Sequence, residues 1–244
     1  MEDRQMKLNS MFKKTVLSIV CATGFASAQF ASAQTLDVKI TNLTHGMFFT
    51  PLLVSAHDNT SHIFETGDVA STSLQAMAEG GDLTGLLTDT VALGAANVEN
   101  PAGGLLAPST STMLTDFDTG ANDHLSIVSM LLPTNDGFLG LDAWKIPEDA
   151  GTYTLYLNAY DAGTEVNDEL VNGGGASGVL GIPVNPGANG GTAGTGVTTA
   201  ETNQSVHIHR GNVGDTDAMG GVSDVDSRIH RWLNPVAKVV VTVK

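Results

Sequence analysis

Short runs in which apolar and polar residues alternate recur along most of the chain. Leu36, Val38 and Ile40 alternate with polar neighbours, as residues of a half-buried strand do. Further extended runs follow at 47–56, 110–117, 125–132, 152–160, 205–210 and 235–244. Many short strands with little helical periodicity favour an all-β fold, and we expect an antiparallel β-sandwich.

Two segments depart from this pattern. Between residues 69 and 93 the apolar residues follow helical spacing, interrupted by Gly80 and Gly81, which predicts two short helices or turns. Residues 172–202 are rich in Gly, Asn, Ala and Thr and carry few large apolar side chains. Such a segment buries little apolar area, so we expect a long surface loop.

The first residues are typical of an export signal. Lys13 and Lys14 precede an apolar run at 16–25, and small residues follow at 26–28 and 31–33. This order predicts a secretory signal peptide over 1–33, with cleavage after Ala33 and Ala28 as the competing site. The apolar run is short for a membrane span. We therefore expect one exported domain, residues 34–244, that is periplasmic, secreted or at the cell surface.

Charge and cysteine content narrow the partners. The chain has a formal net charge of −15, and removing the signal takes away four basic and two acidic residues, which leaves −17. Such an acidic protein repels nucleic acid phosphates and favours cations. The single cysteine, Cys21, lies in the predicted signal, so the domain has no disulfide. The partner is expected to be a protein or surface ligand, and the sequence leaves the oligomeric state open.

Two segments place carboxylates in a Gly-containing turn directly after a strand-like run. They are Pro133-Thr-Asn-Asp136-Gly-Phe138-Leu-Gly140 and Tyr160-Asp161-Ala-Gly163-Thr-Glu165. If the preceding strands are neighbours in one sheet, both turns meet at one end of the domain. Oxygen ligands on loops at the edge of a β-scaffold suit a hard cation such as Ca²⁺.

The same two segments resemble the spondin N-terminal domain family, in which Pro-Ser-Pro-Asp-Trp-Phe-Val-Gly is followed by Tyr-Asp-Ala-Gly-Thr-Asp. The segments Ile40-Thr-Asn-Leu-Thr44 and Trp232-Leu-Asn-Pro-Val-Ala-Lys-Val239 are also similar to bacterial members. The resemblance implies a sandwich similar to C2 domains, a calcium ion held by loops at one end, and an adhesive, matrix-binding role. It also implies that Asp136 and Asp161 are ligands, that Glu165 replaces an Asp as a third, and that backbone carbonyls complete the shell.

Each carboxylate also has a simpler interpretation. Asp136 or Asp161 could form an Asx turn, in which the carboxylate accepts backbone N–H groups. Asp142 is expected to be a solvated turn residue or to support a ligand. Gly137 stands where the family has an aromatic residue, so the role of that ring is in doubt here. The four aspartates 215, 217, 224 and 226 are expected to form a solvated acidic loop.

His207 and His209 form an alternative site. Residues two apart in a strand share a face, so both imidazoles could reach one transition metal. A metal-dependent enzyme built on this pair is the alternative function, and a purely structural envelope domain is another. A third ligand would come from His45, His57, His62, His124 or His230, which no spacing supports.

Catalytic motifs do not stand out in the chain. It lacks a Gly-x-Ser-x-Gly elbow, a His-Glu-x-x-His helix and a phosphate-binding loop, so we expect no enzyme. Aromatic residues make up only 5% of the chain, and strand alternation assigns several of them to packing. A sugar-stacking platform is therefore disfavoured for its five candidates, Trp144, Tyr153, Tyr156, Tyr160 and Trp232.

Overall fold

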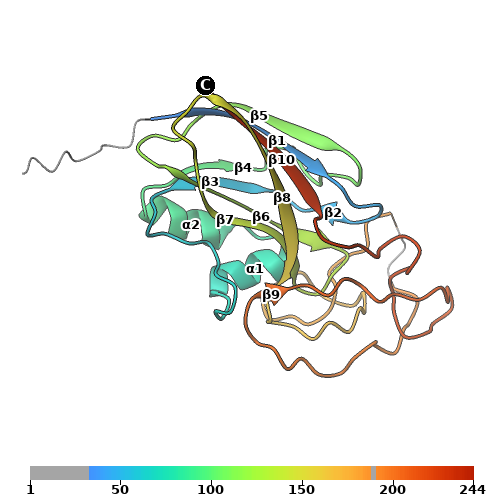
Figure 1. Cartoon of the computed structure of the whole chain (residues 1–244). Coiled ribbons are helices and arrows are strands. Elements are labelled where there is room, and N and C mark those ends of the chain that lie inside the picture. Colours follow the sequence, from blue (N-terminus) through green and yellow to red (C-terminus); the bar gives the residue numbers. More distant parts are fainter. Residues whose placement is uncertain (1–32, 188–190) are drawn as a thin grey trace, which may run out of the picture. The chain divides into compact units, whose positions relative to one another are not determined.

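The computed structural model describes residues 33–187 and 191–244, and Figure 1 shows its arrangement. The predicted signal peptide lies outside the described residues, apart from its last position. The strands are β1 Thr35–Asn42, β2 Phe48–Phe49, β3 Leu53–His57, β4 Ala96–Glu99, β5 Ser111–Asp118, β6 His124–Leu132, β7 Gly137–Lys145, β8 Gly151–Asp161, β9 His207–Ile208 and β10 Ala237–Val243. The helices are α1 Thr72–Gly80 and α2 Thr84–Ala92. The predicted all-β class is confirmed.

The strands form one antiparallel sheet that folds over on itself. Its order is β4-β3-β6-β7-β8-β10-β1-β5, with β2 added to β6 and β9 added to β8. β3 and β1 lie far apart in this order, yet Val54 and Ile40 belong to one buried cluster. Figure 1 accordingly shows β1, β5 and β10 over β3, β4 and β6. The main apolar core fills the space between these two parts of the sheet.

β6 is buried on both faces, which explains why most of its residues are apolar and why they do not alternate strictly with polar ones. Ile127 and Leu131 point into the main core, whereas Val128 and Met130 belong to a second cluster that includes Leu74, Met77 and Leu86 of the helices. Alternate residues of a strand point to opposite faces. The helices therefore cover the outer face of β3, β6 and β7.

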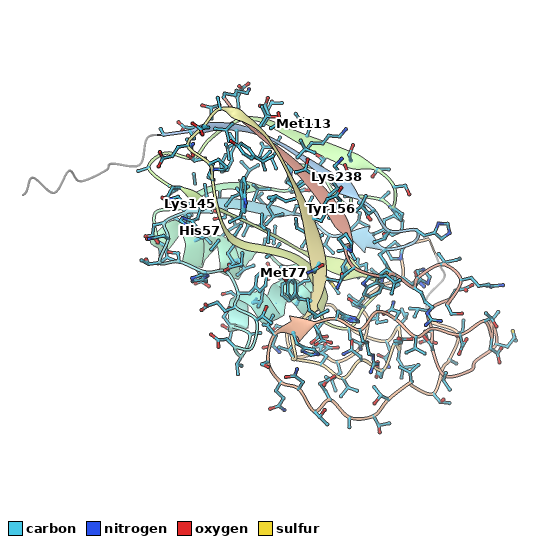
Figure 2. The ribbon with its side chains drawn as sticks, in the orientation of Figure 1. His57, Met77, Met113, Lys145, Tyr156 and Lys238 are labelled. Carbon is cyan, nitrogen blue, oxygen red and sulfur yellow. The ribbon has the colours of Figure 1, made fainter. Side chains whose placement is uncertain are left out.

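The outward face of the other half of the sheet is solvated. Met113 of β5 and Tyr156 of β8 are 52% and 61% exposed, and Lys238 pairs with Tyr156 across β10. Figure 2 labels Met113, Tyr156 and Lys238 on this solvated half of the sheet, whereas Met77 of α1 is fully buried. This half of the sheet thus follows the alternation that the sequence predicts.

Both expected helices are present, and local residues set their ends. The Ser71 side chain accepts the Leu74 N–H at 3.1 Å and caps α1. Gly81 ends it in the left-handed conformation at φ 71°, which glycine adopts without strain. The predicted break between two helices at Gly80 and Gly81 is therefore confirmed.

Two elements, β4 and β7, differ from the sequence-based expectation. β4 was not anticipated, and β7 occupies residues that were interpreted as a turn extending to Asp142. β6 and β8 are consequently not neighbours, because β7 lies between them. The two carboxylate turns still meet, since β7 starts directly after Asp136 and pairs Gly137 with Asp161. The described residues between 172 and 202 contain no helix or strand, as expected.

Candidate metal centre

Asp136 ends the turn between β6 and β7. The Thr134 hydroxyl closes this turn, donating to the Leu131 carbonyl at 2.6 Å and accepting the Gly137 N–H at 3.0 Å. A Cβ at Gly137 would approach Thr134 Oγ1 to 2.7 Å and His209 Cδ2 to 3.0 Å. The space that a side chain at position 137 would need is therefore taken by this turn and by a histidine.

The Asp136 carboxylate holds the second turn. Its Oδ2 accepts the N–H groups of Thr164 at 2.8 Å and Glu165 at 3.0 Å. The backbone carbonyl of Asp136 accepts the Ala162 N–H at 3.2 Å. Both turns are thus joined at one point, as the motif pair predicted.

Asp161 is the last residue of β8 and forms an Asx turn. Its Oδ1 accepts the Gly163 N–H at 2.8 Å. Gly163 has φ 70°, and a Cβ there would lie 2.7 Å from the Gln204 carbonyl carbon, so only glycine fits. The other oxygen, Oδ2, accepts Asn167 Nδ2 at 2.7 Å and lies 3.8 Å from His207 Nε2.

The electrostatics of the pair are unfavourable for two negative charges. Asp136 is fully buried, and burial followed by the charge of Asp161 raises its pKa to about 7 against the opposing N–H donors. The Oδ1 atom of Asp136 is buried and has no hydrogen-bond partner among the described residues. An unpartnered buried carboxylate oxygen is costly, and a bound cation would relieve that cost.

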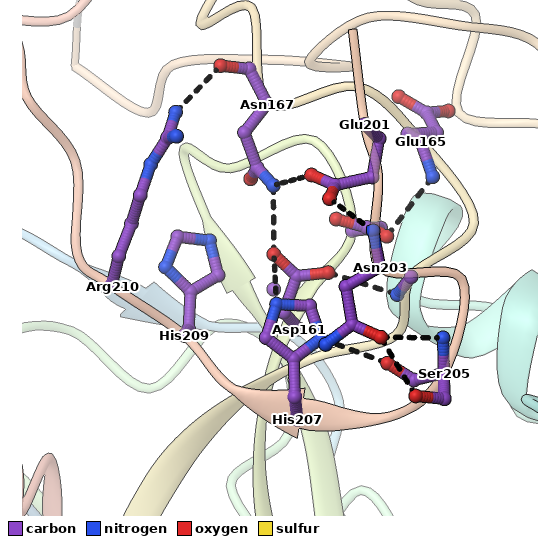
Figure 3. A network of polar contacts seen from close by, with 12 residues as sticks. Asp161, Glu165, Asn167, Glu201, Asn203, Ser205, His207, His209 and Arg210 are labelled. Carbon is purple, nitrogen blue, oxygen red and sulfur yellow. Dashed lines mark hydrogen bonds and ion pairs between the residues drawn. The ribbon is translucent and has the colours of Figure 1, made fainter. Parts of the chain in front are cut away.

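Glu165 reaches this centre through its backbone rather than its carboxylate. Oε2 accepts the Gly181 N–H at 2.9 Å and the Asn135 amide at 3.4 Å, and Oε1 has no partner within the described chain. Burial, with a further contribution from the charge of Glu79, raises the Glu165 pKa to about 8. Figure 3 shows the carboxylate pointing away from Asp161. The structure therefore brings Asp136 and Asp161 together but directs the Glu165 carboxylate elsewhere.

The two histidines have different surroundings. His207, in β9, pairs with Asp161, and its Nδ1 lies 2.8 Å from the Ser205 carbonyl, which leaves Nε2 for the carboxylate. His209 lies beyond β9 and is 4% exposed, with its ring 5.0 Å from that of Trp232. Burial lowers the pKa of His209 to about 4. The strand alternation that would set both imidazoles on one face thus ends before His209.

Two residues that sequence reasoning missed complete the polar network in Figure 3. Asn167 donates to Asp161 and, at 3.4 Å, to Glu201 Oε2. The other carboxylate oxygen of Glu201 accepts the N–H groups of Thr202 and Asn203. Both residues lie in loops without a periodic pattern, so no sequence signal indicated them.

The other sequence-predicted acidic residues have structural partners. Asp142 lies in β7 rather than in a turn, and its carboxylate contacts His62. Asp224 is 8% exposed, and its oxygens accept the N–H groups of Val171, Thr192 and Gly194. The 215–226 segment is therefore partly buried and held by its own carboxylates, which differs from the expected solvated loop.

The centre offers few side-chain ligands. Within 33–187 and 191–244, no three His, Cys, Asp or Glu side chains are arranged as one metal-binding group. Two adjacent buried carboxylates with a free oxygen fit a hard cation if backbone or water oxygens complete its shell. Asp136 and Asp161 would hold such an ion.

Comparison with known protein families gives a match. The model of the Spondin_N family matches residues 41–168, which include both carboxylate turns. No curated protein matches the chain. In the described part of the chain, no helix is long and apolar enough to cross a membrane.

Proposed function

The chain belongs to the spondin N-terminal domain family, and we propose that it is an exported calcium-binding domain that attaches to a protein or surface ligand. The single observation that supports calcium binding is the buried pair Asp136 and Asp161, with an oxygen of Asp136 left without a partner. Export is supported by the predicted signal at 1–33. The adhesive role rests on the resemblance to the family, because fold alone does not determine function.

The position of the pair suggests what the ion would do. Asp136 already fixes the second turn by accepting two of its N–H groups, and Asp161 fixes Gly163 and Asn167. Calcium bound here would neutralise both carboxylates and tighten the contact between the two turns. Because both carboxylates are buried, the ion would act on a partner through the two turns that it fixes.

Thermal unfolding tests the binding step. We expect Ca²⁺ to raise the unfolding midpoint of chelator-stripped protein and to have no effect on Asp136→Asn, which keeps the side-chain volume but loses the charge. Asp217→Asn is the matched control, because Asp217 is an exposed loop aspartate whose Oδ1 accepts one N–H group. An equal calcium-dependent shift in Asp136→Asn would contradict the assignment.

A transition-metal centre is the second candidate, favoured by the contact of His207 Nε2 with Asp161 Oδ2 at 3.8 Å. In this case a metal-dependent enzyme would use His207 with His209. Elemental analysis of protein purified without an affinity tag separates the two proposals. Stoichiometric zinc or copper that disappears in His207→Ala would support the second candidate, whereas calcium alone would support the first.

A partner experiment separates an adhesive domain from a purely structural one. Surface extracts passed over the immobilised protein should yield a specific partner in calcium and lose it in chelator. The Asp136→Asn variant should retain nothing in either condition. Recovery of no specific partner in both conditions would favour a structural envelope domain.

A further inference from the structure

A second polar site lies in the pocket between residues 62–66, the middle of β7 and the end of β8. The pocket has a volume of about 400 Å³ and is lined by His62, Phe64, Glu65, Thr66, Leu141, Asp142 and Tyr160. This volume lies in the range of small-molecule sites. None of its lining residues contributes a carboxylate to the Asp136–Asp161 centre.

The pocket contains a histidine, His62, whose ring orientation is fixed by the carboxylate of Asp142. His62 Nδ1 lies 2.5 Å from Asp142 Oδ2, and the Ile63 N–H donates to Asp142 Oδ1 at 2.8 Å. Because the carboxylate accepts the proton on Nδ1, Nε2 is the nitrogen that remains for a ligand. The His62 side chain is 38% exposed, so a ligand in the pocket can reach it.

Asp142 is itself held by the strands. The Ser126 hydroxyl of β6 lies 3.5 Å from Asp142 Oδ1, and the same oxygen atom of Ser126 accepts the Ala143 N–H at 2.9 Å. His57 Nε2 lies 2.7 Å from this hydroxyl on the other side. The imidazole of His62 is therefore positioned by a chain of contacts that starts in the buried sheet.

An aromatic wall faces these polar groups. The rings of Phe64 and Tyr160 lie 4.9 Å apart, and Phe138 packs against both. Gly140 makes this packing possible, because a Cβ there would lie 2.5 Å from Phe64 Cζ and 3.1 Å from Tyr160 Cδ2. Phe64 is 7% exposed, so its ring is already packed against its neighbours without a ligand.

The charged groups of the pocket disfavour both anionic and cationic ligands. Glu65 and the net charge of −15 disfavour an anion such as phosphate. The hydrogen bond to Asp142 raises the pKa of His62, and a protonated imidazole disfavours an ammonium group. Hydroxyl groups suit both states, because they donate to a neutral imidazole and accept from a charged one. An aromatic wall beside such groups suits a ring with one apolar face.

In contrast to the sequence-based expectation that Tyr160 serves only packing, we propose that this pocket binds a neutral saccharide unit, with hydroxyl groups on His62 Nε2 and Glu65 and the sugar ring against Tyr160. The site is separate from the calcium centre and does not depend on it. The carboxylate of Asp142 acts as a positioning group for the imidazole. A saccharide site on an exported domain would provide a second means of attachment to a glycan-bearing surface.

Ligand-observed NMR in the presence of chelator tests the proposal without the calcium centre. The probes are the methyl glycosides of glucose, galactose, mannose and N-acetylglucosamine, with choline and methyl phosphate as counter-probes. We expect saturation transfer to at least one glycoside, with a dissociation constant of about 1 mM, and none to the counter-probes. His62→Gln, which removes the imidazole, and Tyr160→Leu, which removes the flat ring, should each weaken binding by about threefold to tenfold.

Matched variants outside the pocket provide the control. His45→Gln removes an exposed histidine and Tyr156→Leu removes the ring of an exposed tyrosine, and both should bind the glycoside like the unmodified protein. Gly140→Ala should displace Phe64 and abolish binding. Absence of transfer to all four glycosides, transfer to choline or methyl phosphate instead, or equal binding by His62→Gln would overturn the proposal.

Discussion

In the sheet, backbone groups pair with one another around an aliphatic core, whereas in residues 162–236 buried carboxylates accept many of the backbone N–H groups. Glu169, 2% exposed, accepts the N–H groups of Val213 and Gly214. Asp224 accepts three more N–H groups in the same way. The strands β1 and β10, by contrast, pair without interruption from Leu36 and Val243 to Asn42 and Ala237.

The difference indicates which free-energy terms hold each region. Burial of apolar area stabilises the sheet, and this term is insensitive to pH. The loop region depends on carboxylates that must present acceptor oxygens in a dry environment. Substitutions that remove apolar side-chain volume should therefore destabilise the sheet most. Substitutions that remove a buried carboxylate charge should act mainly on the loops and on the candidate site in them.

The largest expected effect is a cavity in the core. Ile40 is fully buried in β1, between β10 and β5. We expect Ile40→Ala to lower the free energy of unfolding by about 2–5 kcal/mol, through lost apolar contact and the cavity left behind. Urea unfolding measures this change. A smaller loss of unfolding free energy than that of Glu169→Gln, described next, would contradict this account of the two regions.

A smaller effect is expected when one loop carboxylate loses an acceptor oxygen. Besides its two N–H donors, Glu169 accepts the Ser223 hydroxyl at 2.6 Å. Glu169→Gln replaces one of these acceptors with an NH₂ group, and we expect a loss of about 1–3 kcal/mol in the same urea assay.

The control for this variant is Arg228→Ala in the same region. It breaks an exposed ion pair with Asp226, and such pairs contribute little to stability. The urea midpoint should therefore be unchanged. Equal effects of Glu169→Gln and Arg228→Ala would show that the buried carboxylate has no special role.

Stability should also depend on pH, and the sign of this dependence follows from the raised pKa values of Asp136, about 7, and Glu165, about 8. The folded protein holds these protons more tightly than the unfolded chain, whose values are 3.8 and 4.5. This stabilisation is complete below about pH 4 and is lost as the pH rises through about 7 to 8.

Thermal unfolding in chelator should follow this prediction. The midpoint should fall between about pH 5 and about pH 9, and it should fall less in Asp136→Asn, which has no proton to lose at this position. Burial alone would raise the pKa of Asp224, but the backbone N–H groups that donate to its carboxylate outweigh this effect and keep the pKa below its usual range. Asp224 therefore does not titrate in this window. A midpoint that rises with pH in chelator would contradict the account.

The same contrast explains which parts of the molecule could be predicted. Strands such as β1 and β10 carry a period of two, and the helices carry their own period and a glycine break, so their positions follow from the sequence. β7 was missed because its residues are buried or half-buried on both faces, and Gly140 and Asp142 interrupt the expected pattern. Such a strand reads as a turn when only periodicity is used.

The candidate site was predictable only where its carboxylates lie in turns beside strands. Asp136 and Asp161 were found because each follows a strand, and strand pairing then brings their turns together. Asn167 and Glu201 come from loop segments whose folding depends on long-range hydrogen bonds, which leave no local pattern. The direction of the Glu165 side chain depends on Gly181, sixteen residues away, and could not be inferred from its place in the motif.

Calorimetric titration of Ca²⁺ into chelator-stripped protein tests the central claim most directly, with Asp136→Asn/Asp161→Asn measured alongside. We predict saturable binding by the unmodified protein and none by the double variant, whose two amides keep the shape of the turns without their charge. Absence of binding by the unmodified protein, or an unchanged isotherm in the double variant, would show that the buried carboxylate pair is not a calcium site.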